Sequence, residues 1–90
     1  MMLSSKQCEI ARLLTKTNIT NEQINTEYNS IKKTDSDLAV QEINGLLIKH
    51  NDSFDKGFDV MTDDFTIISS KYDISPATLF CLLMEYFNKQ

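Results

Sequence analysis

The sequence contains few of the residues that make tight turns. Its 90 residues include two glycines, one proline and no tryptophan. An all-β fold needs a tight turn between most neighbouring strands, and glycine and proline supply many of those turns. Their scarcity therefore predicts helices joined by short links. We expect an all-α fold, in which residues 1–90 form one small domain, a bundle of four or five helices.

Basic residues are also scarce and scattered. Nine Lys and Arg stand against 13 Asp and Glu, which gives a net charge of −4, and Lys32-Lys33 is the only adjacent basic pair. A protein that binds nucleic acid through charge normally carries a basic patch. Non-specific nucleic-acid binding is therefore disfavoured, although a dimer could still assemble a local patch.

Segments that direct a chain to a membrane are missing as well. No run approaches the ~18 apolar residues of a membrane span. The stretch from Met1 to Lys6 has no long apolar run after a basic start, so it does not have the pattern of a signal peptide. Cys8 and Cys81 are far apart in the sequence and form no CxxC pattern. We expect a cytoplasmic protein with two buried free thiols.

Several segments carry the chemistry that starts a helix. The pattern Ser/Thr-x-x-Gln, a capping-box spacing, occurs at Ser4 and again at Thr20. Ser75 places a hydroxyl cap directly before Pro76, and proline is favoured at the first helical position. The predicted helices run from about Ser5 to Thr17, Thr20 to Ile31, Asp35 to His50, Thr62 to Lys71 and Pro76 to Lys89.

Apolar residues at helical spacing give the candidate core positions. In the first helix, Ile10, Leu13 and Leu14 stand at positions i, i+3 and i+4, the pattern of an amphipathic helix. Cys8 and Ala11 lie near the edge of this stripe. The corresponding positions of the second and third helices are Ile24, Tyr28 and Ile31, and then Ala39, Val40, Ile43, Leu46 and Leu47.

The third helix contains a competing signal. Asn44-Gly45 lies between two apolar runs, and this dipeptide is the strongest short hairpin signal. The flanking runs, however, do not alternate between apolar and polar residues as a half-buried hairpin should. A continuous helix fits the spacing better, although an interior glycine costs roughly 1 kcal/mol relative to alanine. We therefore favour a helix, with a hairpin as the alternative.

The last helix is apolar nearly all round, which a solvated helix cannot be. Two interpretations remain open: the helix is the central core element, or one of its faces is an interface. In the second case Leu79, Leu82, Leu83 and Tyr86 face the core. The partner-binding stripe would then consist of Ala77, Phe80, Cys81, Met84 and Phe87. Exposed aromatic and methionine side chains are typical of protein interfaces.

The stretch from Phe65 to Met84 resembles the helix-turn-helix motif of bacterial repressors. Ser69 occupies the small position, Asp73 stands where glycine is usual, and Ile68, Tyr72, Ile74, Leu79 and Leu82 fall at the buried spacings. The resemblance implies a DNA-binding fold whose second helix reads bases. The positions that would reach base edges are Ser75, Pro76, Ala77, Phe80, Cys81 and Met84. None is an Arg, Lys, Asn or Gln, the side chains that pair with guanine and adenine edges.

Acidic residues gather after the third helix and at the start of the fourth: Asp52, Asp55, Asp59, Asp63 and Asp64. An EF-hand alignment on Gly57 fails, because Phe54 and Lys56 then occupy ligand positions. These acids form either a solvated surface or a mimic of nucleic-acid phosphates that occupies a basic groove on a partner. His50 is the only histidine and has no catalytic companion nearby in the sequence, so we expect no catalytic, metal or cofactor site.

These observations favour a small acidic interaction protein without enzymatic activity, an inhibitor or adaptor that binds a protein partner or a second copy of itself. A dimeric helix-turn-helix transcription regulator is the alternative, and an acidic nucleic-acid mimic is the third reading. Small size and acidity suit regulators of the kind that phages and mobile elements encode, by analogy of composition alone.

Overall fold

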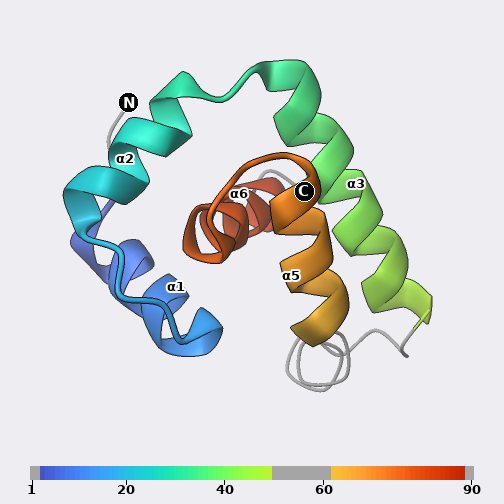
Figure 1. The fold of residues 1–90 in the computed structure, drawn as a ribbon, viewed down its shortest axis with the longest axis horizontal. Helices are drawn as coiled ribbons and strands as arrows, with labels where there is room; N and C mark the ends of the chain where they lie inside the picture. Colours follow the sequence, from blue (N-terminus) through green and yellow to red (C-terminus); the bar gives the residue numbers. More distant parts are fainter. Residues whose placement is uncertain (1–2, 50–61, 89–90) are drawn as a thin grey trace.

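The computed structural model describes residues 3–49 and 62–88. This part of the chain contains no strand and is built from helices, as predicted (Figure 1). The helices are α1 (Ser5–Thr15), α2 (Asn21–Ser30), α3 (Lys33–Lys49), α5 (Thr62–Lys71) and α6 (Pro76–Asn88). Each lies within two or three residues of its predicted bounds, so the all-α fold is confirmed, with five helices in the described residues.

The two predicted capping boxes are both present. The Ser4 hydroxyl accepts a hydrogen bond from the Gln7 backbone N–H at 3.1 Å, and the Gln7 side chain accepts one from the Ser4 N–H at 2.9 Å. Thr20 and Gln23 repeat the arrangement at 3.1 and 2.9 Å. These reciprocal bonds satisfy backbone donors that a helix start leaves without partners, which fixes where α1 and α2 begin.

Helix α6 is the centre of the molecule. In Figure 1 the other four helices surround it, and α6 contacts each of them. Every residue from Ala77 to Leu83 is buried, which covers nearly two turns of helix on all sides. A helix that is apolar all round requires such surroundings. Of the two interpretations of the last helix, the central core element is therefore the correct one for these two turns.

The predicted exposed stripe on this helix is wrong for three of its five residues. Ala77, Phe80 and Cys81 have exposed fractions of 0%, 1% and 0%. Met84 is half-buried, and Phe87 is 40% exposed. The physical reason is that other helices pack around α6 on all sides. No stripe along the whole length of α6 can therefore face solvent. Beyond its first residue, Pro76, α6 reaches the surface only from Met84 onward.

The buried face of α1 also differs from the prediction. Leu13 and Leu14 are 70% and 45% exposed, whereas Cys8 and Ala11 are wholly buried. The α1 backbone comes close to α6, since the Cys81 sulfur lies 3.9 Å from the Gln7 carbonyl oxygen. Small side chains allow this approach, and bulky leucines at the same place would hold the two helices apart.

Asn44 and Gly45 lie inside α3, so the predicted helix is confirmed and the hairpin is wrong. Ala39, Val40 and Ile43 are buried as expected from their spacing. Around Gly45 there is open space: apart from its chain neighbours and the adjacent backbone of α3, no atom lies within 4 Å of the place where a Cβ would stand. The glycine is therefore not required by packing.

Candidate partner-binding groove

The turn between α5 and α6 follows the helix-turn-helix resemblance in one detail. Asp73, at the position where glycine is usual, has a φ of 53°, in the left-handed region. Aspartate tolerates this region better than most residues. The turn is closed by the Ile74 N–H, which donates to the Ser69 carbonyl at 2.9 Å, and by the Asp73 N–H, which donates to the Ser70 carbonyl at 3.2 Å.

The second helix of this pair is not placed to read DNA. A recognition helix enters the major groove with its first turns against the base edges. In α6 those turns hold Ala77, Phe80 and Cys81, which are buried against the other helices. The Ser75 hydroxyl donates to Glu27 of α2 at 2.6 Å, so it too is engaged within the chain. The pair builds the core and does not present α6 outward.

A groove of about 460 Å³ opens between α2, α3 and α6. Its floor is apolar, because Val40 and Leu82 are buried there and Ile31 is half-buried. Two half-buried tyrosines, Tyr28 and Tyr86, also line it. The remaining lining residues are polar or charged: Lys33, Ser36, Asp37, Gln41 and Glu85. Aromatic and aliphatic side chains with a polar rim are the usual composition of a binding site.

The charges at the rim of this groove are arranged in two groups. Lys33 and Asp37, one turn apart on α3, form an exposed ion pair with 3.2 Å between their charged atoms. Such an exposed pair contributes little to stability. Glu85 accepts a hydrogen bond from the Gln7 amide at 2.7 Å, which ties α6 to α1. Two carboxylates against one ammonium leave the rim acidic.

Tyr28 keeps its proton well above neutral pH. Its pKa is raised, first by burial and then by electrostatic repulsion from Glu85 and Cys81. Each of these effects disfavours the phenolate. The groove therefore contains a neutral phenol, which can donate one hydrogen bond to a bound group.

The last turn of α6, where Glu85 and Tyr86 line the groove, extends past it to the surface. The rings of Tyr86 and Phe87 meet edge to face, with their centroids 5.6 Å apart. Met84 and Phe87 are thus the two members of the predicted stripe that solvent can reach. Sequence reasoning missed the groove itself, because Tyr28 and Ile31 were predicted as core positions of an amphipathic helix. No sequence signal indicates which end of such a stripe stays open.

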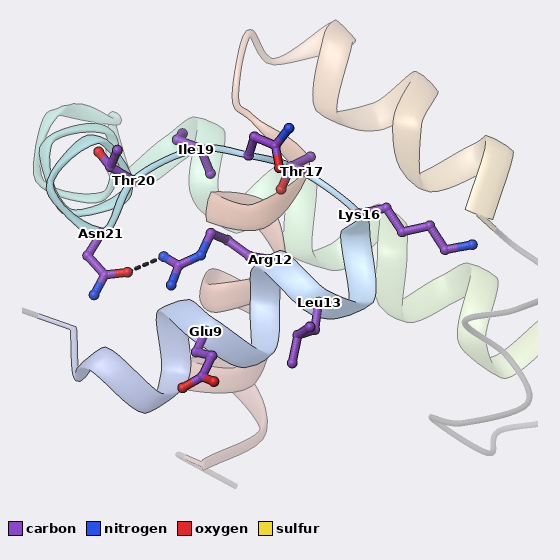
Figure 2. Close-up of a pocket in the computed structure, with 9 residues that line it drawn as sticks. Glu9, Arg12, Leu13, Lys16, Thr17, Ile19, Thr20 and Asn21 are labelled. Atoms are coloured by element: carbon purple, nitrogen blue, oxygen red, sulfur yellow. Dashed lines mark hydrogen bonds between the residues drawn. The ribbon is translucent and has the colours of Figure 1, made fainter.

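A second open pocket lies between the end of α1 and the start of α2. Figure 2 shows the Arg12 side chain crossing from α1 to donate a hydrogen bond to the Asn21 side chain at the start of α2. Glu9, Leu13 and Lys16 stand around it. The pocket has charges of both signs and one exposed leucine, which indicate no particular class of ligand. The hydrogen bond between Arg12 and Asn21 joins the two helices.

The predicted acidic surface falls largely outside the described residues. Asp52, Asp55 and Asp59 lie there, together with His50. Asp63 and Asp64 belong to the first turn of α5, but their side chains are not among those that the structure describes. The acidic-mimic reading therefore remains a prediction.

Three further findings concern the class of protein. Among residues 3–49 and 62–88, no group of three or more His, Cys, Asp and Glu is placed to hold a metal ion. In the same residues, no helix is both long and apolar enough to span a membrane. The chain matches no known protein-family model, no curated protein and no solved structure.

Proposed function

We propose that this chain is an interaction protein without enzymatic activity, which binds a partner protein through the groove between α2, α3 and α6 and the adjoining last turn of α6. The observation that carries the proposal is the groove itself. Apolar and aromatic side chains from three helices line an opening, and an exposed phenylalanine, Phe87, stands at the end of one of them. Exposed aromatic surface of this kind is typical of interface centres.

The energetics of the groove suit a modest complex. Burying one phenylalanine side chain contributes roughly 1.5–3 kcal/mol, so Phe87 and the two groove tyrosines supply enough apolar area for one anchor region. The rim is acidic through Asp37 and Glu85. A partner segment with an apolar side chain flanked by basic residues would complement both properties.

A protein partner is favoured over DNA because the first turns of α6 are buried. The net charge of −4 also opposes an approach to phosphates. Small size and acidity suit a regulator, either an inhibitor or an adaptor. We place this activity in the cytoplasm, where free thiols such as those of Cys8 and Cys81 remain reduced.

The test is affinity capture of the tagged full chain from a lysate of its native cells, with and without nuclease. Three variants are compared with the original chain. Phe87→Ser removes the exposed ring, and Gln41→Arg places bulk and positive charge at the groove rim. Ile67→Ser is the matched control, because Ile67 is 64% exposed on α5 and lines none of the pockets described above. All variants must first show the helical circular dichroism of the original chain.

The proposal predicts a stoichiometric protein that survives nuclease, is retained by Ile67→Ser and is lost from both Phe87→Ser and Gln41→Arg. Equal retention by all three variants would contradict the assignment of the groove. Partners that disappear on nuclease treatment would support the helix-turn-helix alternative instead. Capture of a second copy of the chain alone would show self-association in place of a different partner.

A further inference from the structure

Cys8 and Cys81 meet in the interface between the first and last helices. Both side chains have no exposed surface. The Cys81 sulfur lies 3.9 Å from the carbonyl oxygen of Gln7, the residue that directly precedes Cys8. They are also the only cysteines in the chain.

Small residues on both helices allow close contact at this point. Ala11 lies one turn from Cys8 on α1, Ala77 lies one turn from Cys81 on α6, and all four side chains are wholly buried. Packed helix axes are separated by roughly 8–10 Å, and Cα atoms stand about 2.3 Å from their axis. Facing Cα atoms of two such helices are therefore roughly 3–6 Å apart, which overlaps the separation of about 4.4–6.8 Å that a disulfide requires.

The electrostatics of the pair agree with this proximity. The pKa of the Cys81 thiol is raised to about 12, mainly by burial and next by electrostatic repulsion from Cys8. Both effects keep the thiol protonated near neutral pH, so reaction with an oxidant requires transient opening and is slow.

We propose that Cys8 and Cys81 form a reversible disulfide on exposure to a small-molecule disulfide oxidant such as oxidised glutathione. One thiolate attacks a glutathione sulfur, forms a mixed disulfide and releases one reduced glutathione. The second thiolate then attacks the protein sulfur of that mixed disulfide and releases a second reduced glutathione. The protein gives up two electrons and two thiol protons, and these are taken up by the two departing glutathione thiolates.

The cross-link would join α1 to α6 and thus connect the first helix to the central one. A covalent link between residues so far apart in sequence restricts the unfolded chain strongly, so the oxidised form is more stable than the reduced form. This inference does not depend on the proposed partner-binding function, since neither cysteine lines the groove.

The experiment equilibrates the full chain in buffers with varied ratios of reduced to oxidised glutathione, once under native conditions and once in urea. After acid quenching and alkylation, mass spectrometry measures the fraction that carries an internal disulfide, and peptide mapping identifies the linked residues. We expect the effective concentration of the thiol pair to be on the order of 100-fold higher in the folded chain than in urea. The oxidised chain should also unfold at a higher urea concentration.

An effective concentration in the folded chain equal to or below that in urea would overturn the proposal. So would a folded chain that accumulates only glutathione adducts or intermolecular dimers. The main measurement uses the unsubstituted chain, so no destabilised core variant is needed. The single variants Cys8→Ala and Cys81→Ala serve to identify the adduct and dimer species in the mass spectra.

Discussion

In the part of the chain that the structure describes, two residues other than glycine adopt the left-handed conformation. Lys16 and Asp73 have φ values of 55° and 53°, and they follow the ends of α1 and α5. A side chain at this φ is disfavoured, and lysine lacks the local hydrogen bonding that helps aspartate. At Lys16 two backbone hydrogen bonds offset this cost, because the N–H groups of Lys16 and Thr17 both donate to the Arg12 carbonyl oxygen. Few glycines therefore do not mean few left-handed helix ends.

Gly45 shows the opposite situation, a glycine where the fold does not need one. It lies within α3, its φ is not positive, and an added Cβ would meet open space. Gly45→Ala should raise the free energy of unfolding by about 0.4–1 kcal/mol, because alanine loses less backbone freedom on folding. Urea denaturation measures the change.

A matched substitution on the same helix tests the reason for this gain. Gln41 is exposed on α3, and Gln41→Gly should lower the free energy of unfolding by about 0.5–1 kcal/mol. A neutral or destabilising Gly45→Ala change would show that the helix is not continuous through this residue.

At the scale of the helices, side-chain hydrogen bonds hold neighbouring helices together. We call each such group of hydrogen bonds a joint. Glu27 of α2 accepts hydrogen bonds from Ser75 and from the wholly buried Thr78, next to the start of α6. A carboxylate near a helix N-terminus is also favoured by the helix dipole. On the other side of α6, Glu42 of α3 joins Lys71 and Tyr72 at the end of α5.

The joint between α2 and α6 gives a prediction on stability. Glu27→Ala removes the acceptor of both hydroxyls and should lower the free energy of unfolding by about 2 kcal/mol. Thr26→Ala is the control, because Thr26 is exposed and bonds only the backbone of its own helix. We expect it to stay within about 0.5 kcal/mol of the original chain in urea denaturation. Equal effects of the two changes would contradict the joint.

The joint between α3 and α5 gives a prediction on pH. The hydrogen bond from Tyr72, followed by that from Lys71, lowers the pKa of Glu42 below its ordinary value of 4.5. Below that value the unfolded chain binds more protons than the folded chain, so stability falls as the pH falls. The original chain should therefore lose its advantage over Glu42→Gln as the pH falls through and below about 4.5. Urea midpoints that differ equally at all pH values would contradict this.

Helix starts could be predicted from the sequence because capping is local. Ser4 and Gln7 are three residues apart, and their bonds need nothing from the rest of the chain. Burial could not be predicted in the same way. Leu13 and Cys8 both lie on plausible faces of α1, and the choice between them depends on how closely α6 approaches. The same dependence explains why Phe80 is core and the groove residue Tyr28 is only half-buried.

For the whole molecule, the decisive feature is that its most apolar helix is central and not peripheral. In the described residues α6 packs against α1, α2, α3 and α5, so its apolar residues hold the fold together and its last turn reaches the surface. The proposed function and the proposed cross-link both follow from this arrangement. The first uses the exposed end of α6, and the second uses its closest contact, with α1.

The measurement that tests this arrangement most directly compares two phenylalanines of α6. Phe80 is 1% exposed and Phe87 is 40% exposed. By urea denaturation, Phe80→Ala should lower the free energy of unfolding by about 3–5 kcal/mol, enough to unfold much of a small domain. Phe87→Ala should cost about 1 kcal/mol or less, because its ring already contacts water. Similar costs for the two variants, or a larger cost for Phe87→Ala, would contradict the central position of α6.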